Sequence, residues 1–259
     1  MRIFCYGDSL TSGSSPPSNA LFPYGPHLER ELNDLLRATA RSSADAASPP
    51  DATAVAVRWR GLPGWTASAM ADCLGDPTSG LRSAIGGVRD PPLSLVLILA
   101  GTNDIGAHTS SDDDVAGAIR AVVDPIIRLH RACHHEVGGG GVRTVAVGVP
   151  GSAWQEANDR ARRLRDGVNE ELRRFASSDG GGGRVTYVDF PFPFSRGGRG
   201  RAGRDGDGDG DGECCSELWN DDGLHLSEGG YEALGRRLAP FVFEILDGTS
   251  FRMDDGGPR

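Results

Sequence analysis

Three short segments of the chain carry side chains that can do chemistry when they are brought together. Gly7-Asp8-Ser9-Leu10 supplies a hydroxyl, Gly101-Thr102-Asn103-Asp104 supplies an amide, and Asp222-Gly223-Leu224-His225 supplies a carboxylate three residues before an imidazole. A serine becomes an effective nucleophile when a base accepts its proton, and a carboxylate can hold that base in the required tautomer. An amide N–H can stabilise a developing oxyanion. Together these residue types predict nucleophilic catalysis at Ser9.

Each segment taken alone also has a structural interpretation. A serine after a strand is often a turn or N-cap residue, and an asparagine in the same place often forms an Asx turn. A histidine in a loop is often a capping or surface residue. The chemical interpretation depends on the combination, in which a nucleophile, an oxyanion donor, an orienting carboxylate and a base follow one another along the chain.

The apolar pattern predicts the elements that position these segments. Short apolar runs predict five strands, at residues 2–6, 55–59, 93–99, 144–149 and 185–188. Helical spacing predicts helices at residues 26–38, 112–134, 155–176 and 228–247, with a loop over 39–53. Alternating strands and helices indicate a three-layer α/β/α sandwich around a five-stranded, mostly parallel sheet. Ligands bind such sheets beyond the carboxyl ends of the strands, where Ser9 and Asn103 are expected.

Composition indicates one globular domain and excludes several classes of partner. The chain has 259 residues and a net charge of −9, which argues against a nucleic-acid or anionic-membrane surface. All 27 basic residues are arginine, so no mechanism can use a lysine. We expect one domain over 1–250, interrupted by a disordered Arg/Gly/Asp-rich insert at 196–215 and followed by a tail at 251–259. The first turn of the 112–134 helix is expected to contain Asp112, Asp113 and Asp114.

Neither a metal site nor a secretion signal is expected. The five cysteines lack the spacing of a zinc site, and a chain of this size is not expected to need a disulfide framework, which favours a reducing compartment. Asp205, Asp207 and Asp209 imitate half of a calcium loop, but Ser216 stands where its final glutamate belongs. The N-terminus lacks a signal-peptide pattern, which predicts a cytoplasmic protein, with a mature secreted fragment as the alternative. The apolar run at 93–100 is too short to span a bilayer.

The chain order Ser, Asn, Asp, His resembles that of the SGNH (GDSL-type) hydrolase family. The segment Arg60 to Thr66 matches the family's glycine block, where Gly64 is preferred because a threonine follows two residues later, and Gly61 competes. The resemblance covers residues 1–247 apart from the insert, and implies a flavodoxin-like fold. It implies Ser9 as nucleophile, His225 as base, Asp222 as its orienting partner, and an oxyanion hole at Ser9, Gly64 and Asn103. It requires no cofactor.

The resemblance leaves three functions open. The first is hydrolysis of small acyl esters, and the second is removal of acetyl groups from a carbohydrate or transfer of the acyl group to an alcohol. The third is a flavodoxin-like domain that binds a partner without catalysis. The expected partner of either enzyme is a small-molecule or glycan ester. Trp65, Trp154 and Trp219 lie near predicted strand ends, where each is expected either to line the substrate cleft or to pack in the core.

Overall fold

The computed structural model describes residues 1–18, 20–42, 54–86, 93–109, 114–135, 142–178, 181–195 and 215–247. The predicted insert therefore lies outside the described residues except for Cys215, where a short 3-10 helix begins, and so does the predicted tail at 251–259. Within the described residues, no helix is both long enough and apolar enough to cross a membrane.

The strands of the described residues form one parallel sheet in the order β2-β1-β3-β4-β5. Their bounds are Arg2–Gly7 for β1, Ala56–Gly61 for β2, Leu93–Leu99 for β3, Arg143–Val147 for β4 and Val185–Val188 for β5. Every pairing is parallel, which confirms the predicted sheet. The order is that of flavodoxin-like folds, in which ligands bind where the strand order reverses, here between β1 and β3.

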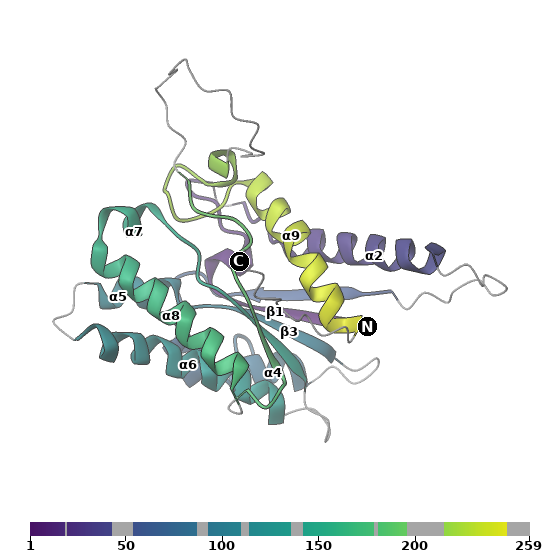
Figure 1. The fold of residues 1–259 in the computed structure, drawn as a ribbon, viewed down its shortest axis with the longest axis horizontal. Helices are drawn as coiled ribbons and strands as arrows, with labels where there is room; N and C mark the ends of the chain where they lie inside the picture. Colours follow the sequence, from purple (N-terminus) through teal and green to yellow (C-terminus); the bar gives the residue numbers. More distant parts are fainter. Residues whose placement is uncertain are drawn as a thin grey trace, which may run out of the picture.

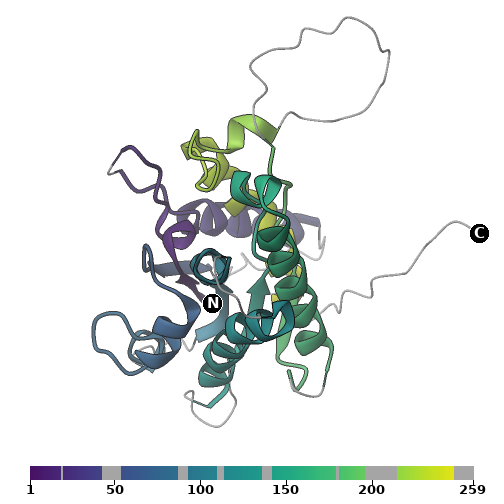
Figure 2. The same ribbon diagram turned by 90° about the vertical axis from the view of Figure 1, so that its left-hand side faces the viewer.

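Helices cover both faces of the sheet and make the molecule a three-layer sandwich (Figures 1 and 2). One face carries α2 (Gly25–Ser42) and α9 (Glu228–Asp247), and the other carries α3 (Ala67–Asp72), α4 (Leu81–Gly86), α6 (Val115–His135) and α8 (Asp159–Ser177). Strand β1 shows how the two cores arise. Ile3 and Cys5 point into the core with α2 and α9, whereas Phe4 and Tyr6 point into the opposite core.

Several predicted helix boundaries were wrong, for local reasons. The predicted helix at 155–176 is two helices, α7 (Ala153–Ala157) and α8, because the Asn158 side chain accepts a hydrogen bond from Ala161 N–H at 3.0 Å and caps α8. Helix α2 continues through Ser42, into the predicted loop at 39–53. Helix α6 begins at Val115, directly after Asp114; Asp112 and Asp113 of the predicted acidic turn lie outside the described residues.

Short helices at the sheet edge were not predicted. They are α1 (Ser9–Ser12), α5 (Thr102–His108) and the 3-10 helix η1 (Cys215–Leu218). Each spans two turns or fewer, so an apolar repeat has no length over which to become visible. Two of them begin in the segments that carry Ser9 and Asn103, and the third leads into the segment that carries His225.

Gly230 allows α9 to pack directly on η1. A Cβ atom at residue 230 would lie 1.9 Å from the carbonyl oxygen of Leu218, at the end of η1. The neighbouring Gly229 has open space, and its nearest contact would be Ser227 Oγ at 3.9 Å. The close approach at Gly230 therefore sets the position of the chain that follows η1.

Gly230→Ala should destabilise the protein by roughly 1–3 kcal/mol, because the added methyl group displaces the backbone at Leu218. Gly229→Ala in the same helix turn is the matched control, and should be neutral or stabilising by up to about 1 kcal/mol. Urea unfolding monitored by circular dichroism measures both. Equal effects of the two substitutions would contradict the close packing at Gly230.

Candidate active site

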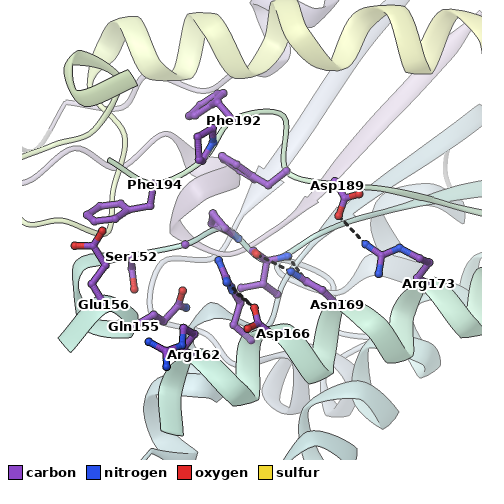
Figure 3. Close-up of a pocket in the computed structure, with 16 residues that line it drawn as sticks. Ser152, Gln155, Glu156, Arg162, Asp166, Asn169, Arg173, Asp189, Phe192 and Phe194 are labelled. Carbon is purple, nitrogen blue, oxygen red and sulfur yellow. Dashed lines mark hydrogen bonds and ion pairs between the residues drawn. The ribbon is translucent and has the colours of Figure 1, made fainter. Parts of the chain in front are cut away.

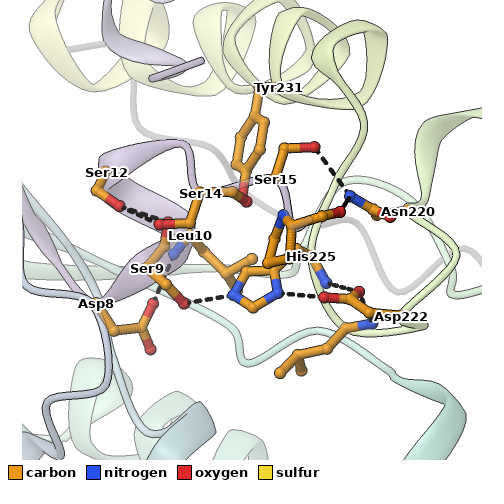
Figure 4. Close-up of polar contacts among 12 residues, drawn as sticks. Asp8, Ser9, Leu10, Ser12, Ser14, Ser15, Asn220, Asp222, His225 and Tyr231 are labelled. Carbon is orange, nitrogen blue, oxygen red and sulfur yellow. Dashed lines mark hydrogen bonds and ion pairs between the residues drawn. The ribbon is translucent and has the colours of Figure 1, made fainter. Parts of the chain in front are cut away.

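Ser9, His225 and Asp222 form a continuous hydrogen-bonded chain (Figure 4). Ser9 is the first residue of α1, directly beyond β1, and is 8% exposed. Its Oγ lies 2.9 Å from His225 Nε2, although the two residues are 216 positions apart. On the other side of the ring, Nδ1 lies 2.6 Å from Asp222 Oδ2. The fold thus brings together the three side chains that the sequence singled out.

His225 is carried by a compact turn, residues 219–226, here called the histidine turn. The turn is closed by hydrogen bonds from Asn220 N–H to the His225 carbonyl at 2.8 Å and from Gly223 N–H to the Asn220 carbonyl at 2.9 Å. Asp222 Oδ1 accepts from the backbone N–H groups of Leu224 and His225, both at 2.9 Å. These bonds fix the Asp222 carboxylate and leave its Oδ2 facing the imidazole.

The charge on Asp222 determines the tautomer of His225. Burial acts to raise the pKa of Asp222, but hydrogen bonds from the His225 ring and from the His225 and Leu224 backbone outweigh it and hold the pKa below the ordinary value. The ionised carboxylate can only accept, so Nδ1 of His225 carries a hydrogen and Nε2 is free to accept one. Ser9 O–H is consequently the donor in the hydrogen bond to His225.

Asn103 and Asp104 hold the loop that contains the glycine block. Asn103 Nδ2 donates to the Trp65 carbonyl at 2.9 Å and retains a second N–H. The Asp104 carboxylate, 3% exposed, accepts from Ala67 N–H at 2.8 Å and Ser68 N–H at 3.4 Å, where α3 begins. In the sequence, Asp104 was noted only as the last residue of the segment Gly101-Thr102-Asn103-Asp104. Its hydrogen-bond partner Ala67 lies 37 residues earlier in the chain.

The two glycines of the glycine block have different surroundings. Gly64 has a positive φ of 78°, no atom lies within 4 Å of a Cβ built on it, and no described residue accepts from its N–H. A Cβ on Gly61 would instead lie 2.0 Å from Ser12 N, in the backbone of α1. Gly61 is therefore needed for packing of β2 against α1, whereas the N–H of Gly64 is available to a ligand.

Two residues that sequence reasoning missed bond to residues 14–16, here called the serine loop: Asn220 from the histidine turn and Tyr231 from α9. Asn220 Nδ2 donates to Ser15 Oγ at 2.9 Å and to the Pro16 carbonyl at 2.5 Å. Tyr231 on α9 donates to the Ser14 carbonyl at 2.7 Å (Figure 4). Asn220 lies in an Asn/Asp/Gly stretch that predicts a turn, but nothing in that stretch indicates a partner about two hundred residues earlier.

The three tryptophans differ in their surroundings. Trp219 is 7% exposed and packs against the phenylalanines of the 190–194 segment, so it is a packing residue. Trp65 is partly buried against the core, and its carbonyl binds Asn103. Trp154 on α7 is 55% exposed. Its neighbour Ala153 donates from its N–H to the Gly223 carbonyl at 2.8 Å, which places Trp154 beside the histidine turn.

Asp8, the residue before Ser9, is a fully buried carboxyl group. Its Oδ1 accepts from Leu10 N–H at 2.9 Å and caps α1, while Oδ2 has no hydrogen-bond partner among the described residues. Burial raises the pKa of Asp8 to about 7; the Leu10 N–H opposes this effect and the nearby Asp104 carboxylate adds to it. Asp8 therefore holds a proton in mildly acidic solution, where an exposed aspartate is ionised.

Comparisons with known proteins define the family. Residues 5–233 match the model of the GDSL-like lipase/acylhydrolase family, so the chain belongs to that family. It is a carboxylic ester hydrolase, as the family resemblance in the sequence implied. A search of curated proteins found no match. Among the described residues, no cluster of three or more His, Cys, Asp or Glu is placed to hold a metal ion.

Solved structures share the fold at low sequence identity. A proposed arylesterase from Agrobacterium tumefaciens str. C58 is 20% identical with a TM-score of 0.57, over 94% of this chain and 99% of its own. A carbohydrate acetylesterase from Sinorhizobium meliloti is 19% identical with a TM-score of 0.55, over 94% and 99%. An aryl esterase from M. smegmatis is 19% identical with a TM-score of 0.53, over 96% and 99%.

Asp8→Asn should remove a pH dependence of stability. With a pKa of about 7 in the folded state and 3.8 as its ordinary value, Asp8 is ionised in the unfolded chain and takes up a proton on folding in the window between them. Its contribution to stability is complete below pH 4 and is lost as the pH rises through 7. The difference in free energy of unfolding between Asp8→Asn and wild type should shift in favour of the variant by about 4 kcal/mol from pH 4 to pH 8.

Urea unfolding of both proteins at several pH values measures this difference. All other titrating groups are the same in the two proteins, so their contributions to the pH dependence cancel. The exposed Asp72→Asn variant is the matched control and should show no comparable shift. Parallel pH profiles for Asp8→Asn and wild type would show that Asp8 is ionised in the folded protein.

Proposed function

We propose that the protein hydrolyses small acyl esters through an acyl-enzyme on Ser9, with His225 and Asp222 completing a catalytic triad. The observation that carries this proposal is the unbroken pair of hydrogen bonds from Asp222 through His225 to Ser9, at 2.6 and 2.9 Å. A nucleophile whose proton already points at an oriented base meets the geometric requirement for acyl transfer.

In the first half of the reaction, Ser9 Oγ attacks the carbonyl carbon of the ester while its proton passes to His225 Nε2. The resulting imidazolium is stabilised by the Asp222 carboxylate, which remains ionised. When the tetrahedral intermediate collapses, the bond to the alcohol oxygen breaks and His225 returns the proton to that oxygen. The alcohol leaves, and the acyl group remains on Ser9 as an ester.

In the second half, water takes the place of the alcohol. His225 Nε2 accepts a proton from the water as its oxygen attacks the acyl-enzyme, and the same proton returns to Ser9 Oγ when the carboxylic acid leaves. The net change is the addition of one water to one ester. An alcohol in the position of the water would give acyl transfer by the same steps.

The oxyanion of each tetrahedral intermediate accepts hydrogen bonds from three donors: the N–H groups of Ser9 and Gly64 and the free N–H of Asn103. Support comes from the open surroundings of Gly64 and from the Asn103 bond to Trp65, which orients the amide and leaves one hydrogen to donate. Such preorganised donors act mainly on the transition state.

Carbohydrate acetylesterase activity is the second candidate, because a carbohydrate acetylesterase is among the structural neighbours at near-complete coverage. A non-catalytic binding domain would have no need for the aligned triad. A cytoplasmic location accompanies the proposal, and the free thiols of Cys5, Cys73 and Cys133 fit a reducing compartment.

Ser9→Ala should abolish turnover of p-nitrophenyl acetate, because no other hydroxyl is bonded to His225 Nε2 among the described residues. The variant should keep the wild-type circular dichroism spectrum and melting temperature. Ser83→Ala, an exposed serine on α4, is the matched control and should keep full activity. Near-normal turnover by Ser9→Ala would refute the proposed nucleophile.

Asn103→Ala should lower kcat by roughly 10²–10³ and change KM much less, because an oxyanion donor acts on the transition state. Asn103→Asp keeps the side-chain shape but places a carboxylate at the oxyanion, so its kcat should fall at least as far. Initial rates on p-nitrophenyl acetate give both constants. An unchanged kcat in Asn103→Ala would reassign Asn103 to holding the Trp65 loop.

A further inference from the structure

A second cavity lies apart from the Ser9 site, between α7, α8 and the segment 189–194 (Figure 3). Its volume is about 750 Å³, within the range of small-molecule sites. None of Ser9, His225 or Asp222 lines it. The walls combine the loop 149–152, the part of α8 from Arg162 to Arg173 and a run of phenylalanines, so they offer polar and aromatic groups together.

The charges in the wall are balanced. The lining contains three arginines and three carboxylates, the latter from Glu156, Asp166 and Asp189. Each arginine is paired with a carboxylate at 2.5–2.9 Å: Arg162 with Asp159 just outside the lining, Arg165 with Asp166, and Arg173 with Asp189. An anionic ligand such as a phosphate would have to compete with those carboxylates. The cavity therefore favours a ligand without net charge.

Gln155 supplies a hydrogen-bond acceptor that the protein leaves unused. The residue lies on the α7 side of the cavity (Figure 3), is 5% exposed, and its Oε1 has no hydrogen-bond partner among the described residues. A buried acceptor without a donor costs about 1–3 kcal/mol. A small side-chain adjustment that brings Oε1 to a ligand O–H would remove that cost.

Aromatic rings stand on the other wall. Phe190 and Phe194 line the cavity and are each only partly buried, and Phe194 lies across from the Ser152 end of α7 (Figure 3). A ring face accepts the apolar C–H face of a ligand, while Gln155 accepts from a hydroxyl. Among neutral ligands, a sugar ring has both an apolar face and hydroxyl donors. We propose that this cavity binds a neutral sugar ring.

Both walls of the cavity are attached to the histidine turn. The Phe194 ring packs edge-on against Trp219, with centroids 5.0 Å apart, and Trp219 begins that turn. On the opposite wall, Ala153 of α7 donates to the Gly223 carbonyl at 2.8 Å. A sugar here, either free or part of an ester substrate, lies beside the chain that positions His225. In the second case the inference extends the proposed function to glycan esters.

The binding test uses Ser9→Ala protein, so that it does not depend on turnover. Titration with xylotetraose and with cellotetraose, followed by NMR of backbone amides, should give saturable shifts at Gly151, Arg165 and Phe194, with a Kd on the order of 1 mM. Adding Gln155→Met or Phe194→Ala should weaken binding at least about 10-fold. Phe243→Ala, a partly buried phenylalanine on α9 outside the cavity, is the matched control and should bind normally.

Stability separates a binding role of Gln155 from a structural one. If the Gln155 amide binds a ligand, Gln155→Met should weaken sugar binding but keep or raise the melting temperature, because the substitution removes a buried polar group that has no partner. A large fall in melting temperature would show that the amide holds the fold. The inference is overturned if neither saccharide gives saturable shifts, if the variants bind as well as their parent, or if 1-hexanol saturates the cavity and the saccharides do not.

Kinetics with the catalytically intact protein distinguish the two sources of the sugar. If the sugar belongs to the substrate, Gln155→Met and Phe194→Ala should lower kcat/KM on acetylated xylotetraose at least about 5-fold relative to kcat/KM on p-nitrophenyl acetate. If the ligand is a free saccharide, the ratio of the two kcat/KM values should stay at that of wild type while saccharide binding is lost. Failure of the proposed function is a separate result, namely an unmutated chain that does not hydrolyse p-nitrophenyl acetate.

Discussion

The proposed catalytic arrangement depends on the fixed position of Asp222. Its carboxylate accepts three hydrogen bonds, two from the backbone of its own turn and one from the imidazole. The two backbone bonds prevent the carboxylate from rotating, and the third determines which nitrogen of His225 carries the hydrogen. Without this fixed acceptor, the hydrogen of the imidazole could lie on Nε2 instead of Nδ1. Nε2 could then not accept the proton of Ser9, although the two atoms lie 2.9 Å apart.

The fold supplies the rest by holding two distant parts of the chain together. Ser9 is placed by the end of β1, whereas the histidine turn is placed by η1 and α9. Asn220 and Tyr231 bond to the 14–16 loop and connect the two, and Gly230 permits the contact between α9 and η1. The same turn also contacts both walls of the α7–α8 cavity, through Ala153 and Phe194. A change at the cavity therefore has a short path of packed contacts to His225.

Features of the fold and the site that depend on neighbouring residues could be predicted from the sequence. Apolar runs identified the five strands, most clearly the central β3, which is buried along almost its whole length and is apolar at every position but one. The residues around Ser9, Asn103 and His225 were visible as short segments next to those strands. Side chains whose partners are distant in sequence were not visible: Asp104 bonds to the start of α3, and Asn220 bonds to the serine loop. The cavity was also missed, since its walls come from three segments that only the fold brings together.

The central claim, that Ser9 is activated by His225, is tested most directly by covalent labelling. The full chain is treated with a fluorophosphonate at neutral pH, and the modified site is located by mass mapping of peptides, in wild type and in His225→Ala. The account predicts a single adduct on Ser9 with a stoichiometry near one, formed at least about 10²-fold more slowly without the imidazole. An adduct on another residue, or equal labelling rates in the two proteins, would contradict it.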